Sequence, residues 1–183
     1  MYLSVLLRPA VPAASAQTVT IGAAVAVCRA VQELCGLELG IKWVNDLYYQ
    51  GKKVCGILTE AGTDLESGRL EWLVVGIGLN LTATAADWPP ELAEKAGSLY
   101  PGGPAPVSRA ALAGAIARQL LALCPAFDCL DEYRARCFVP GHWVTVCTGH
   151  RDLRRKGPLP STRQGGWWSS GRTAARRHYA AAR

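Results

Sequence analysis

The sequence predicts an α+β protein whose mixed or antiparallel sheet is flanked by helices. Three observations lead to this fold class. Short apolar runs rich in branched residues lie between turn residues, as β-strands do. Two longer segments repeat apolar residues every three or four positions, as helices do. Several strands follow one another with only turns between them, which favours antiparallel pairing. The 183 residues, half of them apolar, suit one ordinary domain with a small appendage.

The first two elements are a strand and a helix. The apolar run 2–8 predicts a buried strand, and apolar residues at helical spacing predict a helix over 18–35. Thr18 or Thr20 can cap this helix, and Gly36 ends it. The first run lacks the basic start and the length of a secretion signal. No apolar run reaches the ~18 residues of a membrane span, so we expect no membrane partner.

Strands are predicted to dominate the middle of the chain. The predicted elements are an extended segment at 39–44, a hairpin of 47–50 with 53–60 that turns at Gly51-Lys52, a further turn at 62–68 and a strand at 70–81. The runs 54–58 and 70–81 are almost continuously apolar and branched. Such runs are typical of strands that are covered on both sides, so we place them at the centre of the sheet.

Helices follow a segment rich in Pro and Gly at 82–106. The predicted elements are a short helix at 91–96, a helix at 109–123 capped by Ser108, an amphipathic helix at 127–137 and a strand at 141–148. The last strand is separated from the others by two helices, and we interpret it as the start of a new unit.

Charge divides the chain into two parts. The net charge is +6, but residues 151–183 alone carry +8, and residues 1–150 carry −2. The basic tail has neither helical nor strand periodicity, and it contains the pair Trp167-Trp168. One hypothesis is a disordered basic tail that binds nucleic acid through phosphate contacts and stacking. The body of the chain is mildly acidic, and we expect no nucleic-acid partner for it.

The cysteines favour a reducing compartment. There are seven, an odd number, and no two of them form a C-x-x-C motif. This pattern is typical of neither a disulfide framework nor a zinc site. We expect reduced thiols that act as small apolar residues, and a cytoplasmic protein.

The densest polar cluster is Lys42-Trp43-Val44-Asn45-Asp46, which lies between two apolar strands. The next hairpin adds Lys53. A lysine supplies a point charge for phosphate or carboxylate oxygens, and Asn or Asp side chains orient groups or hold Mg²⁺. Two simpler interpretations stay open, because Asn45-Asp46 suits an ordinary turn and hairpin lysines are commonly solvated.

Glycines accompany this cluster. Gly76 and Gly78 precede Asn80 in a Gly-x-Gly-x-Asn pattern at the end of an apolar strand. Glycine lets a backbone or a ligand approach closely, although it also marks β-bulges. The pattern does not open a helix, so it is not a dinucleotide-binding fingerprint.

The segment KWVNDLYYQGKKVCGILTE, followed by VVGIGLNL, resembles the central domain of bacterial biotin–protein ligases (biotin–[acetyl-CoA carboxylase] ligases). The resemblance covers residues 1–146 and implies the biotin/lipoate ligase fold, which is related to class II tRNA synthetases. It implies ATP-dependent activation of biotin to biotinyl-5′-AMP and transfer of the biotinyl group to a lysine of a biotin carrier protein. ATP, biotin and Mg²⁺ are the implied small molecules, and a homodimer is a further implied assembly.

The resemblance also implies roles for eight residues. Lys42 is the implied catalytic residue, contacting the biotin carboxylate and phosphate, and Lys53 supports the adenylate. Asn45 and Asp46 shape the site, and Asn80 lies near the phosphates or metal. The glycines that permit close approach of ligand are Gly56, Gly76 and Gly78. No metal ligand is assigned.

The chain departs from the family pattern in three places. Val44 replaces the usual Pro. The family's Gly/Arg-rich loop belongs before the first strand, so we expect an N-terminally truncated domain with little ligase activity. The family ends in a small β-barrel, whose first strand matches 138–148. Beyond it, the overlapping codon frame of the tail permits a barrel-like sequence, in which Trp167-Trp168 must encode Val. We therefore expect a frameshift near His150.

The match to the family pattern and the departures from it divide the chain into three predicted parts. They are a partial catalytic domain at 1–137, the start of a small β-barrel at 138–150 and a frameshifted, disordered basic tail at 151–183. Two alternatives to a biotin ligase stay open besides the nucleic-acid hypothesis. One is a lipoate or octanoate ligase of the same fold, and the other is a non-catalytic module for binding or dimerisation.

Overall fold

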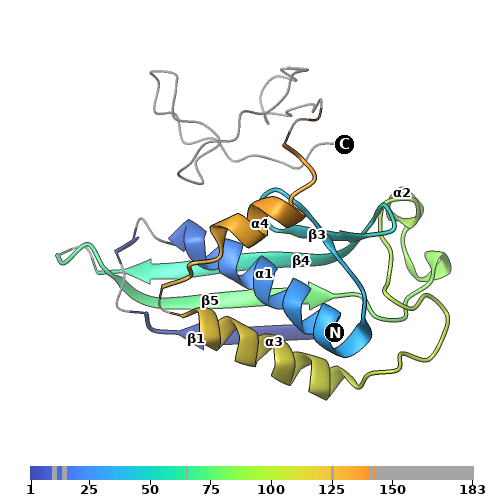
Figure 1. Cartoon of the computed structure of the whole chain (residues 1–183), viewed down its shortest axis with the longest axis horizontal. Coiled ribbons are helices and arrows are strands. Elements are labelled where there is room, and N and C mark those ends of the chain that lie inside the picture. The colour runs from blue at the N-terminus through green and yellow to red at the C-terminus, as the bar shows by residue number, and fades with distance from the viewer. Residues whose placement is uncertain (10–11, 14–15, 65, 125, 141, 143–183) are drawn as a thin grey trace. The chain divides into compact units, whose positions relative to one another are not determined.

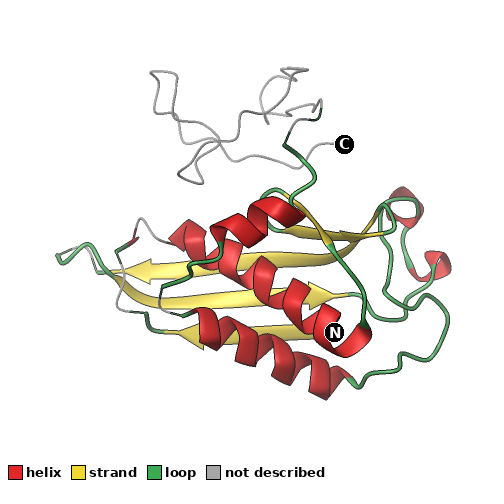
Figure 2. Ribbon diagram, in the orientation of Figure 1, coloured by secondary structure: helices red, strands yellow, loops and turns green. Residues whose placement is uncertain are grey.

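Five strands and a layer of helices make up the part of the chain that the computed structural model describes (Figures 1 and 2). The described residues are 1–9, 12–13, 16–64, 66–124, 126–140 and 142. The strands are β1 (Tyr2–Leu7), β2 (Gly40–Lys42), β3 (Asp46–Tyr49), β4 (Lys52–Thr63) and β5 (Leu70–Leu79). The helices are α1 (Ala16–Cys35), the 3₁₀ turn η2 (Ala85–Asp87), α2 (Pro90–Ala93), α3 (Arg109–Leu123) and α4 (Leu130–Arg136).

The strands form one antiparallel sheet in the order β1-β5-β4-β3-β2. The predicted α+β class with an antiparallel sheet is therefore confirmed. The two apolar runs that we placed at the centre of the sheet are β4 and β5, and both are interior strands. Buried and accessible residues alternate along β5, which is the pattern of a strand with one apolar and one open face.

The helices α1, α3 and α4 cover one face of the sheet (Figure 1). α1 packs on β4 and β5, and α3 and α4 pack against α1. By length and composition α1 could also cross a membrane, although it contains no unbroken apolar run of ~18 residues. Eleven of its residues are buried in this fold, so its apolar character is explained by its place in the core.

Glycine conformations explain two of the predicted boundaries. Gly36 has φ of +67°, which ends α1 at the predicted position. The β3–β4 turn is made by Gln50 and Gly51, with φ of 49° and 77°. Two positive φ angles in a two-residue turn match the right-handed twist of a hairpin. The turn therefore lies one residue before the predicted Gly51-Lys52.

The predictions were wrong for β1 and α4. β1 lies at the edge of the sheet. It is not buried, because helices cover only one of its faces, and Tyr2 and Leu6 are 95% and 57% exposed. α4 begins at Leu130 and not at residue 127, because Phe127 has a φ of +48°, which interrupts a helix. The short helix expected at 91–96 covers Pro90–Ala93.

The chain divides into two units, Met1–Cys137 and Phe138–Arg183. The predicted assignment of 138–150 to a barrel and of 151–183 to a basic tail stays a prediction. The strand expected at 141–148 lies outside the described residues except for His142. The six described cysteines form no disulfide with one another.

Gly22→Ala is expected to lower the free energy of unfolding by about 1–3 kcal/mol, as an overpacked core does. A Cβ at residue 22 would lie 2.5 Å from Cδ1 of the Phe127 ring. Gly114→Ala is the matched control, because a Cβ there meets no atom within 4 Å and α3 would gain about 0.5–1 kcal/mol. Urea unfolding of both variants measures the difference, and equal stabilities would contradict this account of the packing.

Candidate active site

Five residues form a continuous row across all five strands. Lys42 on β2 pairs with Asp46, Asp46 with Gly56, Gly56 with Gly78, and Gly78 with Tyr2 at the other edge. Directly opposed residues of neighbouring strands project on the same side of a sheet. The pairing register therefore brings together four residues that the sequence analysis selected and places them in one line.

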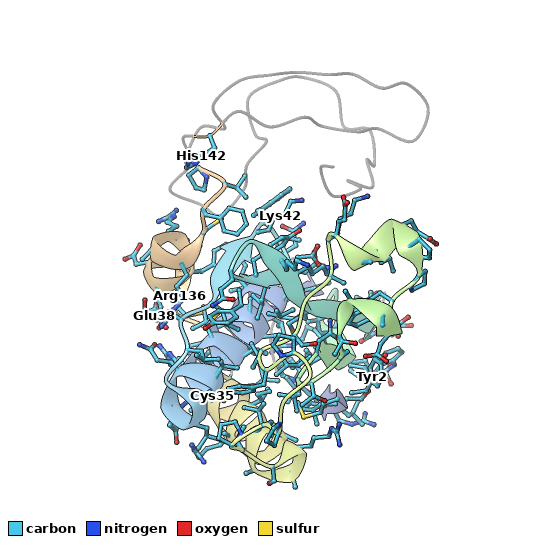
Figure 3. All side chains as sticks on the ribbon, turned by 90° about the vertical axis from the view of Figure 1, so that its right-hand side faces the viewer. Tyr2, Cys35, Glu38, Lys42, Arg136 and His142 are labelled. Atoms are coloured by element: carbon cyan, nitrogen blue, oxygen red, sulfur yellow. The ribbon has the colours of Figure 1, made fainter. Side chains whose placement is uncertain are left out.

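This row lies on the face that α1, α3 and α4 leave open. A Cβ at Gly78 would lie 3.5 Å from the ring of Tyr2, and Tyr2 is almost fully exposed. Tyr2 and Lys42, which end the row, are labelled in Figure 3. Gly76 belongs to the next row, opposite Leu58, whose side chain is 63% exposed. The three predicted glycines thus make a stretch of open sheet without side chains, as close ligand approach requires.

An ion pair borders the glycines. Lys53 Nζ lies 2.6 Å from Asp46 Oδ1, and Asp46 is only 8% exposed. A Cβ at Gly56 would lie 3.5 Å from Lys53 Cε and 3.8 Å from Asp46 Oδ1, so all three residues share the open face.

Lys53 reaches this face because the β3–β4 pairing is irregular. Leu47 pairs with Cys55, whereas Tyr48 pairs with Lys53, so the ladder passes over Val54. Val54 and Cys55 are consecutive and both buried, as expected at a β-bulge. Lys53 and Gly56 therefore face the same side although they lie three residues apart.

Lys42 is the second cation of the site. Its Nζ lies 5.7 Å from the centre of the Tyr48 ring, within the range of a cation–π contact. Burial lowers the pKa of the Lys42 ammonium, and the positive charge of Lys53 lowers it further, while Asp46 acts in the opposite direction. Burial, with the charge of Asp46, raises the pKa of the Tyr48 phenol.

Asn45 holds the turn that joins Lys42 to Asp46. Its side-chain Nδ2 donates to the Ile57 carbonyl at 2.7 Å, and its own carbonyl accepts from the Ile57 amide at 3.0 Å. Residues 43–45 form a turn, so Asn45 lies in a turn as the simpler interpretation expected, whereas Asp46 is the first residue of β3. The Asn45 side chain is therefore occupied in fixing this turn against β4.

Asn80 lies outside the row and holds a loop. Its Nδ2 donates to the Gly97 carbonyl at 3.0 Å, and the Gly97 amide donates to the Lys53 carbonyl at 2.9 Å. Asn80 and the Lys53 backbone thus bind the same loop. No motif in the sequence indicated Tyr2 or Tyr48 as site residues. Strand alternation from Asp46 would have placed Tyr48 on the open face, but Tyr2 could be found only from the register.

The predicted Mg²⁺ does not fit a protein-built site here. Within the described ranges, no three His, Cys, Asp or Glu side chains are grouped to hold a metal ion. Asp46 is the carboxylate of the row, and Lys53 neutralises it. We therefore derive no step through a metal.

Fold and site define the class of this protein, an open-faced α+β sandwich with a polar, glycine-lined sheet face. The chain belongs to the biotin/lipoate A/B protein ligase family, whose model matches residues 1–129. It is 39% identical over 99 residues to the bifunctional ligase/repressor BirA of Bacillus subtilis (strain 168), covering 54% of this chain and 30% of that protein. It is 36% identical over 107 residues to the biotin–[acetyl-CoA-carboxylase] ligase of Paracoccus denitrificans, covering 57% and 40%.

A solved structure of biotin protein ligase from Aquifex aeolicus in complex with biotin and ATP matches with a TM-score of 0.64 and 24% identity, covering 86% of this chain and 65% of that one. This likeness confirms the expected biotin/lipoate ligase fold. The chain spans less than half the length of the two bacterial relatives named above.

Opposite shifts in the pKa of Lys42 are expected from its two charged neighbours. Lys53→Met removes a cation and should raise this pKa, whereas Asp46→Asn removes an anion and should lower it. NMR pH titration of the lysine ε-carbons measures both shifts. Lys52→Met is the matched control, because Lys52 is exposed and its Nζ donates to the Ala93 carbonyl. Shifts of the same sign in both variants would contradict the geometry.

Proposed function

We propose that the open face is the adenylation site of a biotin–protein ligase. The observation that carries the proposal is the row in which Lys42 and Asp46 stand beside Gly56 and Gly78, with Lys53 paired to Asp46 next to the row. A bare stretch of sheet bordered by cations suits a flat ligand that carries carboxylate and phosphate groups. The names of the Paracoccus denitrificans relative and of the Aquifex aeolicus structure, both biotin ligases, support biotin as that ligand.

In the first step, a carboxylate oxygen of biotin attacks the α-phosphorus of ATP. A new oxygen–phosphorus bond forms, the bond to the β-phosphate breaks, and pyrophosphate leaves with the electron pair. Negative charge spreads over the phosphate oxygens in the transition state, and fixed cations stabilise it. Lys42 supplies the desolvated cation, contacting the carboxylate and phosphate. Lys53, held by Asp46, supports the adenylate.

In the second step, the ε-amine of a carrier-protein lysine attacks the carbonyl carbon of biotinyl-5′-AMP. An amide bond forms, AMP leaves, and the amine loses a proton. Gly56, Gly76 and Gly78 leave room for close approach of the two reactants, which is the main requirement of a transfer between bound groups. Asn45 and Asn80 act indirectly, by fixing the turn and the loop beside the cations.

The partner and compartment follow from the same proposal. The partner is a biotin carrier protein, as the names of the relatives support. Six cysteines without a disulfide among them, in the described part of the chain, fit a reducing, cytoplasmic compartment. Homodimerisation stays a prediction.

Lys42→Met and Lys53→Met are each expected to reduce biotin-dependent exchange of pyrophosphate into ATP by about 10²–10³-fold, the usual loss when one preorganised charge-stabilising group is removed. Lys52→Met is the matched control, because it removes a neighbouring charge that contacts the Ala93 carbonyl and not Asp46. A loss in the control as large as in Lys53→Met would exclude Lys53 from a specific role.

A binding titration separates the two substrates of the family. The full chain is titrated with biotin and, separately, with lipoate, each in the presence of ATP. Tighter binding of biotin is expected. Tighter binding of lipoate would replace the proposal by a lipoate ligase, and binding of neither ligand would favour a non-catalytic module.

A further inference from the structure

We propose that Tyr133 on α4 is a positioning residue for the candidate site, and that it acts through the turn between β2 and β3. The inference rests on the proposed function for the use of the site, but the contact itself is independent of it. Tyr133 was not selected from the sequence, and it lies 89 residues from its hydrogen-bond partner in the chain.

The turn is held to β4 by Asn45, and a contact from outside the sheet can add to this hold. β2 has three residues, and among the described strands it pairs with β3 alone. The turn residues 43–45 stand outside the ladder, yet Lys42 and Asp46 are its two flanks. A small rotation of this turn would therefore move both charged side chains.

The Tyr133 hydroxyl supplies that contact. It donates to the Val44 carbonyl at 3.0 Å, in the middle of the turn, while Asn45 binds β4 from the next residue. The Tyr133 side chain is only 2% exposed, so its one polar atom is directed at the turn from within the core. Burial raises the pKa of the phenol, which keeps the hydroxyl protonated as a donor.

α4 is itself anchored to α1, and this fixes the position of the Tyr133 hydroxyl. Glu132, the preceding residue, accepts from Arg29 on α1 at 2.6 and 2.9 Å and from Arg136 at 3.2 Å. The end of α4 also touches β2, since Cys137 forms an isolated bridge with Ile41. α4 therefore contacts β2 and the turn that follows it, and it lies beside α1 in Figure 1.

Tyr133→Phe tests the proposal, because it deletes the hydroxyl and keeps the ring that fills the core. Tyr49→Phe is the matched control, since its hydroxyl accepts only a long 3.4 Å contact from Gln50 in the described structure. Two readouts use the full chain without ligand. These are hydrogen exchange of the Ile57 amide, which binds Asn45, and the NMR-measured pKa of Lys42.

We expect Ile57 exchange to rise about tenfold in Tyr133→Phe and not in Tyr49→Phe. The pKa of Lys42 should move toward its ordinary value as the residue becomes less buried. Amides between β4 and β5, away from the turn, should exchange as in the parent chain. A loss of thermal stability with both readouts unchanged would overturn the proposal, because Tyr133 would then only fill space.

A third readout connects the contact to the site. Affinity for a non-hydrolysable sulfamoyl analogue of biotinyl-5′-AMP, measured by calorimetry, should fall about fivefold to tenfold in Tyr133→Phe alone. If the parent chain does not bind the analogue, the proposed function fails, while exchange and titration still decide the role of Tyr133.

A second variant decides the question if Tyr133→Phe does not fold. Glu132→Gln weakens the ion pair with Arg29 that anchors α4 to α1, but keeps the Tyr133 side chain. Faster exchange at Ile57, smaller than tenfold, supports the proposal. Exchange equal to that of the parent chain overturns it.

Discussion

Antiparallel pairing between β4 and β5 is the contact on which the other elements depend. Their register sets Gly56 opposite Gly78 and Ile57 opposite Ile77, so glycines and isoleucines point to opposite faces. The isoleucine face is apolar and must be covered, and α1 covers it. The glycine face is left for chemistry. A slip of one residue would exchange these two faces, so the core and the candidate site are fixed by the same hydrogen bonds.

The two lysines of the open face have different surroundings. Lys53 is matched by Asp46 at 2.6 Å, whereas Lys42 is partly desolvated and its pKa is lowered. These two lysines and one aspartate together carry a net positive charge beside the glycines. An anionic ligand would relieve the repulsion between the two lysines. This explains why a charge arrangement that adds little to folding suits binding of a carboxylate or phosphate.

Local patterns predicted most elements of the fold, because strand and helix periodicity and the caps at Gly36 and Ser108 are local properties. The candidate site was predicted in part. Lys42, Asp46 and Lys53 were selected as a polar cluster, but their alignment with Gly78 and Tyr2 depends on pairing between distant strands. The exposure of β1 and the late start of α4 were missed for a related reason. An apolar run does not reveal how many of its faces are covered, nor does spacing reveal a positive φ.

The bulge at Val54 has a consequence for how the lysine and glycine of β4 are connected. In a regular strand, residues 53 and 56 would face opposite sides, because their separation is an odd number. The extra residue corrects that parity and brings the ammonium to the carboxylate. The number of residues between Lys53 and Gly56, together with the bulge, therefore decides on which face of the sheet Lys53 lies. In a smooth ladder with the same number of residues, the lysine would turn into the apolar layer, with every residue of the site still present in the chain.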